Sequence, residues 1–395
     1  MLTIKLKPRE ERRLRAGHLW VYSNEIETSP QAGHEFRAIE PGSLCHVVDS
    51  RGKPLGLGYA NPRTLLAVRL LSGNADIAID PDWFARRIAT ALALRARIYD
   101  EPYYRLLYGE ADGVPGLVVD RYGDVLVVQI TTAGIEKLKA PLLAALRDVL
   151  APRGILLRND TGGRELEGLP LDNEIVGDVP DLVEIREEGL RYALSLTGGQ
   201  KTGFFYDQRD NRSRLARYVR GRSVLDVFSY VGAWALRALR DGAASAACLD
   251  SSQTALDAAR ASAALNGLTI ETIRDDALAG MKALRVAGRR FDVVVVDPPA
   301  LIKRRKDFEA GLEHYAALNR AAMHLLAADG ILVSCSCSHH LGTDDLQRIL
   351  LREARHMGRR LRLLEQGAQG PDHPVHPAIP ETRYLKGFFC AVTAE

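Results

Sequence analysis

Two polar segments that directly follow apolar runs carry the residues most capable of chemistry in this sequence. The valine-rich run 291–296 suits a strand buried on both faces, and it is followed by Asp297 and two prolines. Because proline cannot continue a strand ladder, the Asp297 carboxylate is expected at the strand's carboxyl end, where ligands of parallel sheets bind. A second apolar run, 331–338, carries Cys335 and Cys337 two positions apart and therefore on one face. A carboxylate and a thiol at neighbouring strand ends predict a reaction centre.

Cys337 is the predicted nucleophile because it lies further along its strand, nearer the carboxyl end, and Cys335 is the second choice. The alternative is that both are ordinary buried thiols, since free cysteine behaves as a small apolar residue. No metal site is predicted, because His339 and His340 have no Cys-x-x-Cys pair with which to complete four zinc ligands.

Three further carboxylates follow apolar runs, at Asp226, Asp250 and Asp276. The first opens an acidic turn that contains Gly232 but lacks the Gly-x-Gly-x-x-Gly pattern of a pyrophosphate site. Asp250 is placed to hold ribose hydroxyls, and Asp276 to meet an adenine amino group. Each alone is equally explained as a helix cap. In this order, and followed by Asp297, they predict an S-adenosylmethionine site of the class I methyltransferase type.

The segment 198–212, which is glycine-rich, then aromatic, then the charged start of a helix, precedes the first of these strands. It is expected to lie over the cofactor as a lid, with a plain interdomain connection as the alternative. The residues predicted to contact S-adenosylmethionine are Gln200, Thr202, Asp226, Phe228, Ser229, Gly232, Asp250, Asp276, Asp297 and Pro298.

These side chains require a particular framework, which the second half of the chain predicts. From about residue 197 apolar strands alternate with amphipathic helices, a pattern typical of a doubly wound parallel sheet with a Rossmann-like arrangement. The expected strands are 223–227, 246–250, 269–274, 291–297 and 330–334. The expected helices are 209–218, 234–240, 252–266, 277–286 and 315–326. A final strand, 384–392, is expected to close the sheet.

The first half of the chain has a different organisation. Residues 1–74 read as short strands separated by turns, which is the pattern of a small β-barrel. Residues 75–196 predict a middle domain in the order strand, strand, helix, strand, strand. We therefore expect an α/β protein with three domains, 1–74, 75–196 and 197–395.

Composition limits the class of protein. At 395 residues with 46% hydrophobic and 26% charged residues, the chain is that of an ordinary globular protein of several domains. Five scattered cysteines, no signal-peptide pattern and no apolar run of membrane-spanning length indicate a cytoplasmic protein without a membrane partner. Residues 1–74 hold eleven Lys/Arg against seven Asp/Glu, a net charge of +4, while the whole chain has +3. A basic module on a near-neutral body fits a phosphate-binding appendage, with a solvated surface as the alternative.

In these residues and motifs, the chain resembles the large-subunit ribosomal RNA methyltransferases that make 5-methylcytosine and carry an amino-terminal PUA domain. The segments that carry the resemblance are 112–124, 199–203, 207–209, 225–230, 297–299, 336–340 and 372–385. Ala300 is a departure, because many relatives have lysine there. The resemblance implies S-adenosylmethionine as methyl donor and 23S ribosomal RNA, or a large-subunit precursor, as substrate, with cytosine as target. It leaves the oligomeric state open, with a homodimer among the options.

The implied chemistry assigns roles to the two predicted catalytic residues. Attack of the Cys337 thiolate on carbon 6 makes carbon 5 of cytosine nucleophilic, while Asp297 hydrogen-bonds ring N3 and the amino edge. A base must then remove the carbon 5 proton. The related two-cysteine enzymes carry a second thiol directly after the Asp motif, which this chain lacks, so Cys335 and His339 stay open as helpers.

Two other functions compete with this one. One is methylation of an exocyclic amino group or another base position, since Asp-Pro-Pro also occurs in such enzymes; these usually place an aromatic residue where Ala300 stands. The other is an inactive RNA-binding assembly factor with the same fold. Near the predicted site, a basic run of Lys303, Arg304, Arg305 and Lys306 is predicted to contact RNA phosphates, with a solvated charge run as the alternative.

Overall fold

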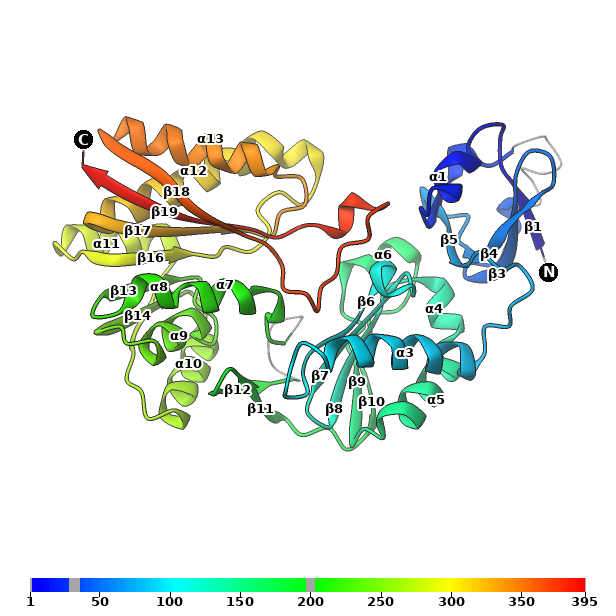
Figure 1. The fold of residues 1–395 in the computed structure, drawn as a ribbon, viewed down its shortest axis with the longest axis horizontal. Coiled ribbons are helices and arrows are strands. Elements are labelled where there is room, and N and C mark those ends of the chain that lie inside the picture. Colours follow the sequence, from blue (N-terminus) through cyan, green and yellow to red (C-terminus); the bar gives the residue numbers. More distant parts are fainter. Residues whose placement is uncertain (1, 28–35, 197–202, 395) are drawn as a thin grey trace. The chain divides into compact units, whose positions relative to one another are not determined.

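The computed structural model divides into two compact units (Figure 1). It describes residues 2–27, 36–196 and 203–394. The first unit comprises Met1–Pro180 with Pro371–Thr382, and the second comprises Asp181–Gly370 with Arg383–Glu395. None of the helices in these described ranges is long and apolar enough to span a membrane.

The first unit begins with a five-stranded sheet in the order β1-β3-β4-β5-β2. Its elements are β1 (Leu2–Lys5), α1 (Glu11–Arg15), β2 (Trp20–Tyr22), β3 (Ser43–Val48), β4 (Pro54–Ala60) and β5 (Leu66–Ser72). Four of these strands follow the sequence pattern. The strand β2 was not predicted, because three residues are too few to show an alternation, and its pairing with β5 fixes it as a strand.

A second five-stranded sheet of this unit has the order β10-β9-β8-β7-β6, and only its β8–β9 pair is parallel. Its elements are α3 (Pro81–Arg95), β6 (Tyr103–Tyr108), β7 (Leu117–Tyr122), β8 (Val125–Ile130), α4 (Ala133–Lys137), α5 (Lys139–Leu150), β9 (Gly154–Leu157), α6 (Gly162–Glu167) and β10 (Glu174–Gly177). The helix α3 starts where the Asp80 carboxylate accepts the Trp83 N–H at 2.8 Å, and it buries Trp83, Phe84 and Ile88. The strands β6 and β10 were not predicted.

A segment far along the chain, 371–382, completes the first unit. Asp372 is fully buried there, and its carboxylate accepts the Arg105 N–H at 3.0 Å. The Asp372 carbonyl accepts from Arg95 Nη2 at 2.8 Å, while the same guanidinium is bidentate on Asp112. Buried charges are stable only when paired in this way, so the network anchors the segment.

The second unit contains a seven-stranded sheet in the order β15-β14-β13-β16-β17-β19-β18, in which β19 alone runs antiparallel to its neighbours. The strands are β13 (Ser223–Val227), β14 (Ser245–Asp250), β15 (Glu271–Arg274), β16 (Phe291–Val296), β17 (Leu326–Ser336), β18 (Arg359–Gly367) and β19 (Lys386–Ala394). This confirms the predicted Rossmann-like class. The predicted last strand exists but does not close the sheet, because β18 pairs on its outer side.

Helices cover this sheet. They are α7 (Arg209–Arg214), α8 (Ala216–Val219), α9 (Ala233–Arg240), α10 (Gln253–Leu265), α11 (Ala277–Val286), α12 (Phe308–Leu325) and α13 (Thr343–His356). The valines of β16 are at most 1% exposed, as expected for a strand covered on both faces. The helix α13 and the strand β18 were not predicted. The apolar face of α13, with Leu346, Ile349 and Leu350, packs into the core.

The remaining two strands, β11 (Leu182–Glu187) and β12 (Leu190–Ser195), form a hairpin of their own. Its turn has positive φ at Glu188 (48°) and Gly189 (79°), as tight hairpin turns require. We expected both strands to belong to the middle domain. They do not pair with its sheet, and the hairpin groups with the second unit. The three-domain division at 74 and 196 therefore stays a prediction.

Candidate active site

The Asp297 carboxylate follows β16 directly, at the carboxyl end of the strand. Its Oδ1 accepts from Gln208 Nε2 at 3.0 Å and its Oδ2 from Trp234 Nε1 at 3.1 Å. Burial raises the pKa of Asp297 to about 6; the two N–H donors oppose this, and the charge of Asp207 adds to it. The carboxyl group is thus fixed in orientation and titrates close to neutral pH.

The orientation of Gln208 is itself determined by its neighbours. Its Oε1 accepts from Asn211 Nδ2 at 2.7 Å, so its amide nitrogen must point toward Asp297. The same Asn211 nitrogen donates to the Ala368 carbonyl at 3.0 Å. A Cβ on Gly367 would lie 1.9 Å from Asn211 Oδ1, so this position of β18 has no room for a side chain. The Asn211 side chain is therefore held tightly, and it holds Gln208.

The two thiols of the β17 strand differ in access. Cys335 is 1% exposed and packs in a core cluster with Val333 and Phe389. Cys337 follows the last residue of the strand, is partly exposed, and has its Sγ 3.8 Å from the Pro298 carbonyl oxygen. Of the two, only Cys337 is open to a reactant and close to the Asp-Pro-Pro turn.

Both thiols sit in surroundings that favour the neutral form. Burial raises the pKa of Cys337 to about 12, with the charges of Asp297 and Asp207 adding to the effect and Lys386 opposing it. Burial raises the pKa of Cys335 well above its usual value. A thiolate at Cys337 therefore requires compensation by positive charge.

Lys386, the first residue of β19, lies beside this site. Its ammonium donates to the Ser338 carbonyl at 2.7 Å and to the Leu341 carbonyl at 2.8 Å. Burial lowers the pKa of Lys386 to about 8, and the neighbouring Cys337 opposes that shift. A cation is thus attached to the loop that carries the predicted nucleophile.

The three other predicted carboxylates have different environments. Asp226 is fully buried, and its Oδ2 accepts the Ala235 N–H at 3.2 Å. Asp250 accepts the Tyr230 N–H and the Ser252 N–H, both at 2.9 Å. Asp276 is exposed and caps α11 by accepting two backbone N–H groups, so the helix-cap alternative applies to it.

The turn between β13 and α9 has an unusual backbone. Phe228 and Tyr230 adopt positive φ (63° and 49°), which costs free energy for residues with a side chain. The N–H groups of Phe228 and Ser229 both point to the Leu249 carbonyl, at 3.0 and 3.3 Å. Gly232 has a φ of 75°, and a Cβ at this position would lie 3.1 Å from Ala259 Cβ, so both the backbone and the packing against α10 favour glycine there.

Two buried carboxylate oxygens without hydrogen-bond partners indicate whether these residues fit S-adenosylmethionine. Asp207 Oδ1 and Asp226 Oδ1 are buried and have no hydrogen-bond partner among the described residues. Burial, with the nearby charges of Asp297 and Asp250, raises the pKa of Asp226 to about 8. Crowded carboxylates with unused oxygens suit a ligand that carries positive charge, and S-adenosylmethionine carries a sulfonium and an ammonium. The residues therefore fit the cofactor.

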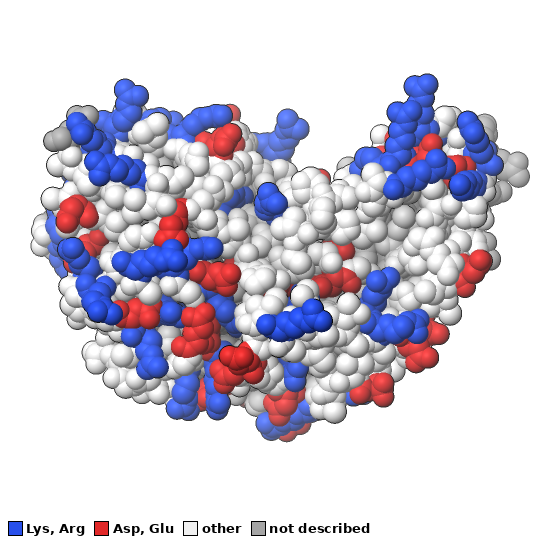
Figure 2. Space-filling model, in the orientation of Figure 1, with Lys and Arg blue, Asp and Glu red and all other residues white. Residues whose placement is uncertain are grey.

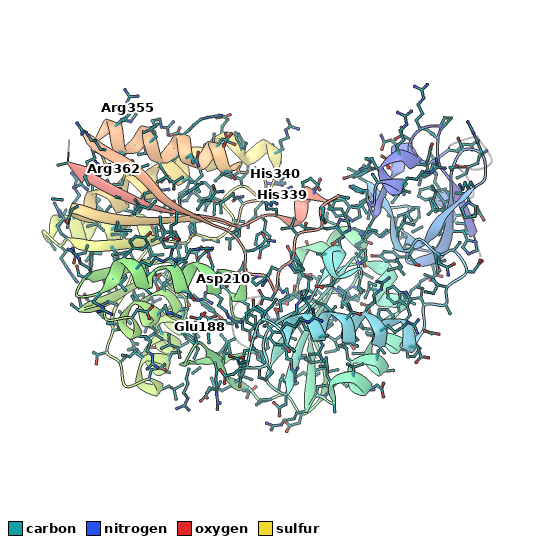
Figure 3. The ribbon with its side chains drawn as sticks, viewed as in Figure 1. Glu188, Asp210, His339, His340, Arg355 and Arg362 are labelled. Carbon is teal, nitrogen blue, oxygen red and sulfur yellow. The ribbon has the colours of Figure 1, made fainter. Side chains whose placement is uncertain are left out.

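The other predicted site residues lie as follows. Gln200 and Thr202 fall outside the described residues. Lys303, Arg304, Arg305 and Lys306 are all exposed between β16 and α12, and Arg304 pairs with Asp307 at 3.0 Å. His339 and His340 are exposed just after β17, with their rings in edge contact (Figure 3). Among the described residues no group of three or more His, Cys, Asp or Glu side chains is arranged to hold a metal ion.

Four residues of this site were not predicted: Asp207, Gln208, Trp234 and Lys386. The first two belong to the short segment 203–209, whose aromatic and charged composition was noted without a role for each residue. Trp234, in the first turn of α9, gave no signal beyond that of a core residue. Lys386 is separated from Cys337 by a helix and a strand, so only the pairing of β17 with β19 brings it near.

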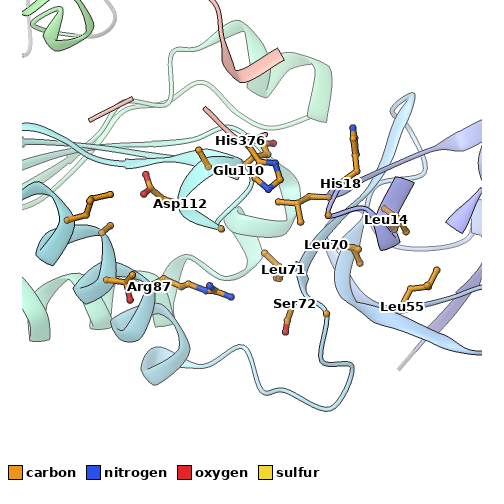
Figure 4. A pocket seen from close by; sticks show the side chains of 18 of the residues that line it. Leu14, His18, Leu55, Leu70, Leu71, Ser72, Arg87, Glu110, Asp112 and His376 are labelled. Atoms are coloured by element: carbon orange, nitrogen blue, oxygen red, sulfur yellow. The ribbon is translucent and has the colours of Figure 1, made fainter. Parts of the chain in front are cut away.

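A groove of about 890 Å³ lies entirely within the first unit and shares no residue with this site (Figure 4). Its lining combines aliphatic residues, among them Leu14, Leu70 and Leu71, with the basic Arg87 and with His376. Residues from the first sheet and from α3 meet there.

Comparisons with protein families match two parts of the chain. Residues 4–73 match a PUA-like domain, and residues 163–384 match the family described as S-adenosylmethionine-dependent methyltransferase. The second match covers more than half of the chain.

Curated relatives match along the whole length. Proteins named ribosomal RNA large subunit methyltransferase I are 38% identical in Erwinia tasmaniensis (99% of this chain, 100% of the relative) and 37% identical in Klebsiella pneumoniae (98% and 97%). Among solved structures, a methyltransferase complexed with SAH has a TM-score of 0.84 at 19% identity, covering 99% of this chain and 100% of that one. A SAM-dependent methyltransferase from Streptococcus mutans has a TM-score of 0.82 at 19% identity, with the same coverage. At 19% identity, this structural similarity shows a shared fold and nothing further.

Proposed function

This chain belongs to the family of S-adenosylmethionine-dependent methyltransferases that includes ribosomal RNA large subunit methyltransferase I, and we propose that it methylates carbon 5 of a cytosine in 23S ribosomal RNA. The single observation that carries the position on the base is the location of Cys337, which is open to a reactant and has its Sγ 3.8 Å from the carbonyl oxygen of Pro298, the residue that follows Asp297. Methylation of an amino group needs no thiol there.

S-adenosylmethionine supplies the methyl group in activated form. Asp226, Asp250 and Asp207 would hold its charged and hydroxylated parts, the first and last through oxygens that are buried and unused in the described structure. We also assign Phe228, Ser229, Gly232, Asp276 and Pro298 to its surroundings, as the sequence predicted. These assignments rest on position after the carboxyl ends of β13, β14, β15 and β16.

Cys337 and Asp297 divide the chemistry at the base. The Cys337 sulfur bonds to carbon 6, and the electron pair of the 5,6 double bond moves toward N3, where Asp297 donates a proton or hydrogen bond. A pKa of about 6 lets Asp297 exchange a proton near neutral pH. Carbon 5 then takes the methyl group. A base then accepts the carbon 5 proton, the electron pair left behind re-forms the 5,6 double bond as the carbon–sulfur bond breaks and returns the thiolate, and N3 gives its proton back to Asp297.

The substrate part of the proposal rests on the relatives' name and on charge. The first 74 residues carry +4 and match a PUA-like domain, and Lys303–Lys306 present four cations beside the Asp-Pro-Pro turn. Phosphates of ribosomal RNA, free or in a large-subunit precursor, would neutralise both. The target base must be unpaired or flipped out to reach Cys337.

Two measurements test this proposal. Bisulfite sequencing of 23S rRNA from cells with and without the gene should show one protected cytosine that depends on the gene. RNA with 5-fluorocytidine at that position should form an adduct with the protein that survives a denaturing gel, because fluorine is not lost as the proton is. Methylation without protection or adduct would indicate the amino group as target instead.

A further inference from the structure

A second basic surface lies at the edge of the seven-stranded sheet opposite the site. It comprises Arg285 at the end of α11, Arg290 before β16, Arg320 and His324 near the end of α12, Arg355 near the end of α13, and Arg359, Arg360 and Arg362 on β18. We name these eight residues the amino-edge patch. They come from five segments of the chain that meet where β16, β17 and β18 begin.

The topology separates this patch from the catalytic residues. The strands β16, β17 and β18 run in one direction, since β17 and β18 are each antiparallel to β19. The patch is at their amino ends, whereas Asp297 and Cys337 follow the carboxyl ends. The nine residues of β19 run from Lys386, paired with Ser336 near the site, to Ala394, paired with Arg359 of the patch, and at about 3.3 Å each they span about 30 Å. Figure 3 shows Arg355 and Arg362 at one end of this unit and His339 and His340 at the other.

The cations of the patch have few carboxylate partners. Among the described residues only Arg320 is paired, with the buried Glu353 at 2.5 Å. Arg290 and Arg359 donate to backbone carbonyls, and Arg285, Arg355, Arg360 and Arg362 are exposed without a partner in the described structure. In Figure 2, Lys and Arg side chains gather over this end of the second unit.

The crowding has an electrostatic cost. Burial lowers the pKa of His324, and the charges of Arg285, Arg359, Arg290 and Arg320 lower it further. Burial and the charge of Arg290 lower the pKa of Arg359 as well. Cations that disfavour one another's charge destabilise the folded protein, and a bound anion removes that cost. Arginine, rather than lysine, is the residue that binds phosphate in a bidentate way.

We propose that the amino-edge patch binds backbone phosphates of the same RNA about 30 Å from the target base. This inference rests on the proposed function in taking ribosomal RNA as the substrate. RNA that ends close to the target cannot reach the patch, whereas a longer RNA can. The patch therefore adds affinity only for long RNA and leaves the chemical step unchanged.

The test compares two charge-matched variants of the full-length protein. The patch variant is Arg285→Gln/Arg355→Gln/Arg362→Gln. The control variant is Arg186→Gln/Arg240→Gln/Arg260→Gln, which also loses three exposed cations of the second unit. Filter binding would be measured against a short hairpin centred on the methylated nucleotide, whichever atom of it carries the methyl group, and against an RNA several times longer, over a range of salt concentrations.

For the long RNA we expect the patch variant to bind at least tenfold more weakly, with a slope of log affinity against log salt reduced by about 2 to 3. For the hairpin, and for the control variant on either RNA, we expect wild-type affinity, and kcat should be unchanged. Wild-type affinity of the patch variant for long RNA, or an equal loss on both lengths, would overturn the inference. Because binding is read without methylation, failure of the cytosine assignment would leave this comparison intact.

Discussion

At the scale of single residues, the site is defined by one carboxyl group held by two N–H donors and one thiol beside it. Gln208 and Trp234 occupy one acceptor position on each oxygen of Asp297, so the remaining lone pairs have a fixed direction. The Cys337 Sγ lies 3.8 Å from the carbonyl oxygen of Pro298, the residue that follows Asp297. The site thus has a defined geometry before any ligand binds, which lowers the cost of reaching a reactive arrangement.

Replacing the two cysteines separately should distinguish their roles. Cys337→Ser should abolish methylation while cofactor binding persists, because a hydroxyl is far less ionised than a thiol at neutral pH. Cys335→Ser should retain turnover with some loss of stability, since it places a hydroxyl in a buried apolar cluster. Single-turnover assays with calorimetric cofactor binding give both readouts. An adduct mapped by mass spectrometry to Cys335 would contradict this assignment.

Gln208→Met removes one donor from Asp297 and should raise the pKa of that carboxyl, since a hydrogen bond to the charged form favours it. Because Asp297 acts as a proton donor to N3, we expect the limb of the pH–rate profile that falls as pH rises to move upward by about one unit, and kcat to fall about 10-fold or more. Gln366→Met, on an exposed position of β18, is the control and should change neither. A lower kcat with an unmoved profile would show that Gln208 is merely structural.

Cofactor binding should depend on pH through the same carboxylates. The pKa of Asp297 is about 6 and that of Asp226 about 8, so both are largely protonated at pH 5 and increasingly charged toward pH 9. A cationic ligand prefers the charged forms, so affinity should rise with pH, by up to about tenfold per unit for one fully coupled proton. Calorimetry in buffers of different ionisation enthalpy should show proton release. Uptake of protons on binding would rule this coupling out.

At the scale of elements, the β11–β12 hairpin is attached to α7 through one buried carboxylate. Glu187 is 3% exposed and accepts from Arg212 at 2.7 and 2.6 Å and from Arg209 at 3.2 Å. The Arg212 guanidinium also donates to the Phe205 carbonyl at 3.0 Å. The segment that carries Gln208 is therefore positioned from the hairpin side as well as from β18.

Glu187→Gln should destabilise the second unit by about 3–5 kcal/mol, because it leaves two buried guanidinium groups without a counter-charge. The matched control is Glu184→Gln on the same hairpin, where the ion pair with Arg191 is exposed and the loss should stay below about 1 kcal/mol. Hydrogen exchange of the hairpin amides measures both. Equal protection in the two variants would show that the buried pair contributes little.

At the scale of the whole molecule, basic residues gather in each of the two units. The first 74 residues carry +4 against +3 for the chain, and the amino-edge patch adds a second basic surface in the other unit. Such a distribution suits an extended polyanion contacted at several places.

Deleting residues 1–74 should weaken RNA binding and leave S-adenosylmethionine binding in place, because the candidate cofactor residues all lie beyond residue 197. The affinity of the full chain should fall with added salt, and the truncated chain should show a smaller slope. The truncated protein must first show a wild-type cofactor affinity by calorimetry. RNA binding that is equally tight at every salt concentration would assign the domain another purpose.

Much of this protein was determined by local features of its sequence. Valine repeats, glycine turns and the order of the carboxylates at 226, 250 and 297 predicted the parallel sheet and its reactive edge, because strand propensity and side-chain alternation act over a few residues. The preference for Cys337 over Cys335 likewise came from position along one strand.

The tertiary structure alone decided which distant residues meet. Several contacts join segments that are far apart in sequence. They are those of Gln208 and Trp234 with Asp297, of Lys386 with the loop that carries Cys337, of Glu187 with Arg212, and of Asp372 with Arg105 of the first unit. The spacing of a polar residue along the chain does not encode its partner across a sheet. That partner is fixed only when packing has excluded water and each buried charge has to be compensated by a group that the fold brings within reach.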